Sequence, residues 1–169
     1  MKKKLTLFLL GSIIGLLIYY GHNTISKHQL KEQLVELIKY LPNCTFYDLN
    51  EHIVSIKNLS KQNLVLVYFH PECEHCQYEV EELYKHQHKF LNTQILMISP
   101  APLQHLKKFN HKYDLDSSDN ISVLWDKEFK FDTYFGASIF PTVIIYQDKK
   151  FVKIYKGEVK IEAIIKHLN

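Results

Sequence analysis

The chain has 169 residues, enough for one ordinary domain plus a short additional segment, and its hydrophobic fraction of 46% can fill a core without a disulfide scaffold. Its formal net charge is +3 at pH 7, and all 21 basic residues are lysines scattered along the sequence, so the bidentate arginine contacts that recognise phosphates and bases are absent. These features argue against nucleic-acid binding.

Residues 1–25 predict a membrane anchor. Lysines occupy positions 2–4, and the segment Leu5 to Tyr20 contains no charged residue and ends in two tyrosines. Lysines favour the cytoplasmic side of a membrane and tyrosines its interface, so we expect a single-pass signal anchor with the domain on the extracytoplasmic, periplasmic side. The apolar run is slightly short for a span and also fits a cleaved secretory signal, although no Ala-x-Ala-like cleavage site follows. A cytosolic protein is the least favoured alternative.

Residues 26–41 predict an amphipathic linker helix, because Leu and Ile recur at helical spacing between Lys and Glu until a proline ends the pattern. Residues 42–169 form the single domain that we expect. It opens with two short strand-like runs, residues 44–49 and 52–56, which the turn-prone dipeptide Asn50-Glu51 joins into a hairpin.

A Cys-x-x-Cys pair, Cys73 and Cys76, stands between a predicted strand and a predicted helix. Residues 63–69 are apolar and β-branched without alternation, which is typical of a strand buried on both faces. Residues 77–91 carry apolar side chains at helical spacing. The cysteines therefore lie at the start of a helix, where unpaired backbone N–H groups and the helix dipole stabilise a thiolate, the species that attacks disulfides.

Two cysteines at this spacing also form half of a zinc site, or an inert disulfide. Cys44 is the one further cysteine, so a four-cysteine zinc site is excluded, whereas a mixed site with His70 or His75 stays open. Redox chemistry is the favoured interpretation, without a cofactor or resident metal. A copper-binding module or metallochaperone using the same two cysteines and a nearby histidine is the alternative. An adaptor that has lost catalysis is the third hypothesis.

The rest of the domain alternates strands and helices. Strands are expected over residues 93–99 and 121–125, helices over 103–113 and 126–135, and a polar loop over 114–120. The last part of the chain predicts a β-hairpin with a proline at the entrance to its first strand, then a closing amphipathic helix; these elements cover residues 140–146, 151–155 and 158–169. The alternation predicts an α/β sandwich with antiparallel strands added at one side.

Several polar or reactive residues receive structural interpretations. Asp126 is expected to cap the helix that follows it. Glu79, Glu81 and Glu82 are interpreted as a solvated helix face whose charge suits the helix dipole. Cys44, at the entrance to the first strand, is interpreted as a small buried apolar residue, with a second resolving thiol as the alternative.

Over about residues 41 to 169 the pattern resembles the thioredoxin-like fold, a three-layer sandwich, and within it the membrane-anchored TlpA-like branch of the redoxin (AhpC/TSA) superfamily. Four pieces carry the resemblance: Leu41-Pro42 with residues 46–49, residues 65–69 with Cys73-Glu74-His75-Cys76, Phe140-Pro141-Thr142, and Lys156-Gly157.

This resemblance implies thiol–disulfide exchange. Cys73 would be the exposed attacking sulfur and Cys76 the resolving one, Pro141 would follow a cis peptide bond beside the pair, and Phe140 would lie against a bound partner. The implied partners are disulfide-containing or dithiol proteins outside the cytoplasm and a membrane electron donor.

The chain also departs from its relatives. Glu72 stands where many have Trp, and Val67 stands where thioredoxins hold a buried carboxylate that relays protons. The peroxiredoxin run Pro-x-x-x-Thr/Ser-x-x-Cys is absent, so peroxidase activity is not expected. A protonated His75 would stabilise the Cys73 thiolate, whereas Glu72, Glu74 and Glu79 would disfavour it. Glu74 and His75 are thus candidate tuning residues, and reduction is the direction that the resemblance implies.

Overall fold

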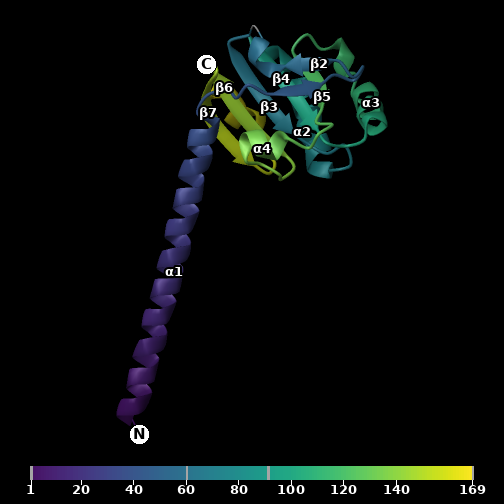
Figure 1. Ribbon diagram of the computed structural model, residues 1–169. Coiled ribbons are helices and arrows are strands. Elements are labelled where there is room, and N and C mark those ends of the chain that lie inside the picture. The colour runs from purple at the N-terminus through teal and green to yellow at the C-terminus, as the bar shows by residue number, and fades with distance from the viewer. Residues whose placement is uncertain (1, 60, 91, 169) are drawn as a thin grey trace. The chain divides into compact units, whose positions relative to one another are not determined.

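In the computed structural model, the described part of the chain covers residues 2–59, 61–90 and 92–168, without the side chains of residues 2–14, 27, 28, 30 and 31 (Figure 1). The chain divides into two compact units, Met1–Glu36 and Leu37–Asn169.

Helix α1 (Lys2–Ile38) makes up the first unit and enters the second. The helix expected over residues 26–41 is therefore a continuation of α1, and it ends before the proline that was expected to stop it. Among the described residues, no helix is both long enough and apolar enough to cross a membrane. The anchor predicted over residues 1–25 falls largely on side chains outside the described part.

In the described residues of the second unit, one seven-stranded sheet has the order β2-β1-β5-β4-β3-β6-β7. Strand β3 pairs in parallel with β4 and β4 with β5, while β1–β2 and β6–β7 are antiparallel hairpins at the two sides (Figure 1). The strands are β1 (Thr45–Tyr47), β2 (Ile53–Ser55), β3 (Asn63–Tyr68), β4 (Thr93–Ser99), β5 (Ile121–Trp125), β6 (Thr142–Gln147) and β7 (Lys150–Lys156).

Helices cover the sheet on both faces, which explains the unbroken apolar run of β3. On one face, Val65 and Val67 join a core cluster with Val80 of α2 and Ile161 of α5. On the other face, the ring of Tyr68 stacks on that of Phe131 in α4, with 4.1 Å between centroids. The four helices described in this unit after α1 are α2 (Glu74–Lys85), α3 (Leu103–Lys112), α4 (Phe131–Phe135) and α5 (Ile161–Ile165).

The expected strands and both hairpins are confirmed, whereas the predicted boundaries of the helices differ from the observed ones. The helix expected over 126–135 is only α4, because the Asp126 carboxylate accepts hydrogen bonds from the backbone N–H groups of Lys130 (2.8 Å) and Phe131 (3.0 Å) and so sets its start. That capping role is the one predicted. The loop expected over 114–120 contains a short 3-10 turn that buries Leu115.

Helix α2 begins and ends earlier than expected. It starts at Glu74, directly after the cap residue Cys73, and ends at Lys85 instead of continuing to residue 91. A separate 3-10 turn, Gln87–Lys89, follows and leads to the buried Phe90 before β4. The closing helix is likewise short, since α5 covers only the central residues of the predicted 158–169.

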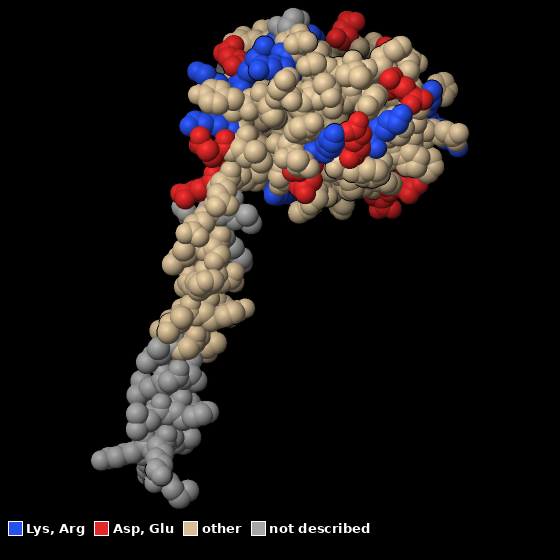
Figure 2. All heavy atoms as spheres, viewed as in Figure 1, with Lys and Arg blue, Asp and Glu red and all other residues tan. Residues whose placement is uncertain are grey.

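The segment after α1 is part of the second unit. The Phe151 N–H donates to the carbonyl of Lys39 (2.9 Å) and the Leu41 N–H to that of Lys149 (2.8 Å), which adds a short stretch of pairing to the outer side of β7. The buried hydroxyl of Tyr146 donates to the Ile38 carbonyl (3.1 Å). On the face shown in Figure 2, lysines and acidic residues are interspersed, in agreement with their scatter along the sequence.

Candidate functional site

The two cysteines lie where β3 passes into α2. After β3, the Phe69 N–H still donates to the carbonyl of Ile98 (3.0 Å), and a turn closed by the Cys73 N–H and the His70 carbonyl (3.0 Å) leads into the helix. Cys73 is the N-cap of α2, and its Sγ accepts a hydrogen bond from the Cys76 N–H at 3.4 Å. The pair therefore occupies the cap and first turn, as the sequence predicted.

The two sulfurs have different environments. Cys73 is partly exposed, so another molecule can reach it, whereas Cys76 is 1% exposed. Burial, the hydrogen bond with Cys73 and the nearby charges of Cys73 and Glu79 raise the pKa of the Cys76 thiol. Cys76 consequently keeps its proton near neutral pH, and Cys73 is the sulfur that another molecule can reach.

Glu79 is a site residue that the sequence interpretation placed wrongly. Instead of lying on a solvated face, its side chain is 1% exposed, and both carboxylate oxygens lack a hydrogen-bond partner among the described residues. Burial, followed by the charge of Glu158, raises the pKa of Glu79 to about 8. Its spacing in the sequence could have predicted this burial. Glu79 stands three residues after Cys76 and four before Leu83, on the face that α2 buries.

The predicted tuning residue His75 has a carboxylate partner from the far end of the chain. Its Nδ1 lies 2.6 Å from Oε2 of Glu158, which follows β7, and both side chains are exposed. Glu158 therefore stands between an imidazole on one side and the buried Glu79, whose pKa it raises, on the other. Glu74, the other predicted tuning residue, is exposed in the first turn of α2.

The loop before β6 also approaches the pair, as the resemblance implied. The Phe140–Pro141 peptide bond is cis, which confirms that prediction. Pro141 is buried, and its carbonyl accepts from the Gly157 N–H (2.8 Å). The half-buried ring of Phe140 lies 5.7 Å from that of His70, three residues before Cys73. Phe140 thus lies beside the turn that leads to Cys73.

The mixed metal site is not assembled in the described part of the chain, where no group of three or more His, Cys, Asp or Glu side chains could hold a metal ion. His70 uses its Nδ1 to accept the Glu72 N–H (3.3 Å), and His75 faces Glu158. Cys44 is buried as predicted, and burial together with the charge of Asp126 raises its pKa to about 12. Cys44 is therefore an inert thiol at neutral pH.

Comparison with known proteins identifies both a family and a fold. The AhpC/TSA family model matches residues 39–155, whereas no curated protein sequence matches the chain. Among solved structures, MTB dsbF matches with a TM-score of 0.65 and 16% identity, covering 75% of this chain and 92% of that one. A secreted Mycobacterium tuberculosis disulfide oxidoreductase homologous to E. coli DsbE gives 0.62 and 18%, covering 75% and 94%. StoA from Bacillus subtilis gives 0.61 and 14%, covering 76% and 100%. At these identities the likeness shows a common fold.

Proposed function

Because the chain belongs to the AhpC/TSA family and has a thioredoxin-like fold, we propose that it is a thiol–disulfide oxidoreductase acting through Cys73 and Cys76. One observation carries the proposal: a partly exposed cysteine caps a helix and is hydrogen bonded to a buried cysteine, with a buried carboxyl group one turn further on. Each of the three groups has a chemical task in disulfide exchange.

The first step is attack on a partner disulfide. The Cys73 thiolate bonds to one partner sulfur and the partner S–S bond breaks, so the other partner sulfur leaves as a thiolate and takes up a proton. Stabilisation of the attacking thiolate comes from the N-terminus of α2, where the Cys76 N–H already points at Cys73 Sγ.

The second step resolves the mixed disulfide. Cys76 loses its proton and attacks Cys73 Sγ, which closes the Cys73–Cys76 disulfide and releases the second partner sulfur as a thiolate. Because Cys76 is buried and its pKa is raised, a base is needed to remove its proton. Glu79, one turn after Cys76 on the buried face of α2, would act as that base in its ionised form, since a pKa of about 8 makes its carboxylate a good proton acceptor. Overall, the partner disulfide gains two electrons and the dithiol loses them.

We propose that the pair works as a reductant. Strong oxidants of this chemistry have a stabilised reduced thiolate. Here Glu74 follows Cys73 directly in the first turn of α2, and the charge of a protonated His75 would be balanced by Glu158. These side chains therefore add little to the stabilisation that the N-terminus of α2 gives the thiolate. A dithiol donor at the membrane would then return the pair to its reduced form.

The place of action is part of the same proposal: a chain tethered to the cytoplasmic membrane with the domain on the periplasmic side. The support is the uncharged run from Leu5 to Tyr20 behind three lysines. In intact cells, a membrane-impermeant maleimide should label Cys73 without lysis, and a Cys73→Ser variant should stay unlabelled. Labelling that requires lysis would refute this placement.

The oxidoreductase proposal is tested by the reduction potential of the pair. Full-length protein in detergent is equilibrated in dithiothreitol or glutathione buffers, and free thiols are counted by the mass added on alkylation. A two-electron couple at roughly −250 mV or below supports a reductant, and a value near about −120 mV indicates an oxidant. The Cys44→Ser variant should give the same potential as wild type. Without a reversible couple in the wild type, the function proposed here is wrong.

A further inference from the structure

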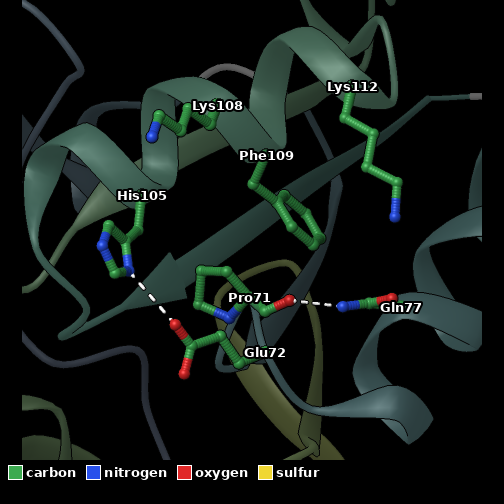
Figure 3. Close-up of a pocket in the computed structure, with 7 residues that line it drawn as sticks. All are labelled: Pro71, Glu72, Gln77, His105, Lys108, Phe109 and Lys112. Carbon is green, nitrogen blue, oxygen red and sulfur yellow. Dashed lines mark hydrogen bonds and ion pairs between the residues drawn. The ribbon is translucent and has the colours of Figure 1, made fainter.

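A pocket of about 340 Å³ lies beside the redox pair, between the turn that precedes α2 and the helix α3 (Figure 3). One wall is made by Pro71 and Glu72, the residues directly before Cys73, and the opposite wall belongs to α3. Neither of the cysteines, Glu79 nor the loop of Pro141 lines it. The proposed disulfide exchange therefore assigns no role to this pocket.

The floor of the pocket is apolar and held in place. Phe109 is 4% exposed, and its ring packs on those of Phe69 (4.9 Å between centroids) and Tyr113 (4.7 Å). Pro71 is buried, and its carbonyl accepts a hydrogen bond from the Gln77 side chain at 2.7 Å. Figure 3 shows Phe109 and Pro71 facing each other across the pocket. The shape thus exists before any ligand arrives.

The rim carries two lysines that have no acidic partner among the described residues. Lys108 and Lys112 lie on either side of Phe109 (Figure 3), and Lys108 has no hydrogen bond or ion pair with any described residue. Lys112 donates only to the hydroxyl of Tyr113 (3.0 Å) and lies over its ring. Among the described residues that line the pocket, the one carboxylate is that of Glu72, and it already faces Nδ1 of His105 at 3.4 Å.

The spacing of the two lysines fits an extended peptide. They are four residues apart on α3, a rise of about 6 Å along the helix. Alternate side chains of an extended chain point to the same side and are about 6.6 Å apart, so two acidic residues with one residue between them match the spacing at which the two lysines leave the helix. An apolar side chain next to them would cover Phe109.

We propose that this pocket binds an acidic, extended segment of the partner protein whose disulfide Cys73 attacks, a substrate class that rests on the proposed function. Two carboxylates pair with Lys108 and Lys112 while the partner cysteine reaches the exposed sulfur two residues beyond Pro71. The charge pairing speeds the encounter and selects among partners.

The test uses peptides with one cysteine joined to 2-thio-5-nitrobenzoate, flanked by two alternate Glu, Gln or Lys residues. Release of the coloured thiol by reduced full-length protein gives the rate of attack. The Glu peptide should react about tenfold faster than the Gln peptide, and the difference should shrink as salt is raised. In Lys108→Gln/Lys112→Gln this preference should vanish, and in Lys108→Glu/Lys112→Glu the Lys peptide should become the fastest.

A matched control removes two exposed lysines outside the pocket, Lys107 on the same helix and Lys57 elsewhere. The variant Lys107→Gln/Lys57→Gln should keep the preference for the Glu peptide. Equal rates for all three peptides with wild type, or a preference that survives loss of both pocket lysines, overturn the proposal.

Binding without chemistry separates this proposal from the proposed function. A Glu peptide whose cysteine is replaced by serine should shift the amide NMR signals of residues 108–112 in wild type and leave them unchanged in Lys108→Gln/Lys112→Gln. If no peptide disulfide is attacked but these shifts appear, the acidic-segment site stands and the oxidoreductase function falls. If all peptides are attacked at one rate and no shifts appear, the oxidoreductase function stands and the acidic-segment site falls.

Discussion

Cys76 and Glu79 lie one helical turn apart on the same buried face of α2, and the charge of Glu79 contributes to the raised pKa of the Cys76 thiol. The two groups therefore compete for a proton in a part of the molecule from which water is largely excluded. In the proposed disulfide exchange, this cysteine and the nearby acid, both with raised pKa values, form a couple that can pass a proton.

The Glu79→Gln variant should slow the second step of exchange. Without the carboxylate, the proton of Cys76 loses its proposed acceptor, and loss of a positioned base typically costs about 10²-fold or more. Resolution of a preformed mixed disulfide at Cys73 can be followed by rapid acid quench between pH 6 and 9. Wild type should accelerate through a midpoint near pH 8, and the variant should lose that rise. Glu81→Gln, on the exposed side of the same helix, is the control, and an unchanged profile in Glu79→Gln would exclude the base.

The same residue should make folding stability depend on pH. The pKa of Glu79 is raised from 4.5 to about 8 on folding, so between these values the folded state holds a proton that the unfolded state has lost. This contribution is fully present below pH 4.5 and is lost as pH rises through 8, at no more than about 1.4 kcal/mol per pH unit. Urea unfolding under reducing conditions measures this effect. The free energy of unfolding of Glu79→Gln should increase relative to that of wild type as pH rises. A constant difference between the two at all pH values would contradict the assignment.

Removing the charge of Glu158 should lower the pKa of Glu79, since that charge is its second cause after burial. In Glu158→Gln, the titration of the Glu79 side-chain carboxyl, followed by ¹³C NMR, should move to lower pH. Glu162→Gln, which removes an exposed acid from α5, should leave the titration where it is in wild type. A midpoint that stays fixed in Glu158→Gln would show that the His75–Glu158 pair does not influence Glu79.

Replacement of Asp126 by Ala should destabilise the domain by about 1–2 kcal/mol, because two backbone N–H groups at the start of α4 lose their acceptor. The same change should lower the pKa of Cys44, to which the charge of Asp126 contributes after burial. Urea unfolding measures the first effect and the pH dependence of slow alkylation at Cys44 the second. Unchanged stability would mean that water replaces the cap.

Much of the fold could be predicted because its central strands are buried on both faces and so read as unbroken apolar runs. The pair at the start of α2 and the cis Phe140–Pro141 bond were likewise predictable, the first from local pattern and the second from resemblance. The boundaries of short helices were harder to predict, since the start of α4 depends on one buried carboxylate rather than on hydrophobic periodicity.

The features that pattern alone could not supply depend on contacts distant in sequence. A glutamate on a helix is usually solvated, and the burial of Glu79 follows from the sheet and the C-terminal segment that pack over α2. The pairing of His75 with Glu158 joins residues 83 positions apart. The pocket between Pro71 and Phe109 likewise exists only once α3 has packed beside the start of α2.

The hydrogen bond from the Tyr146 hydroxyl to the Ile38 carbonyl limits where a truncated form of the domain can begin. A truncation that begins at Pro42, the first residue of the domain expected from the sequence, removes this acceptor and leaves a buried hydroxyl unpaired at a cost of about 1–3 kcal/mol. It also removes the carbonyl of Lys39 that receives the Phe151 N–H. Expression of the second unit alone should therefore start upstream of Leu37, so that the carbonyls of Ile38 and Lys39 stay with the sheet residues that they bind.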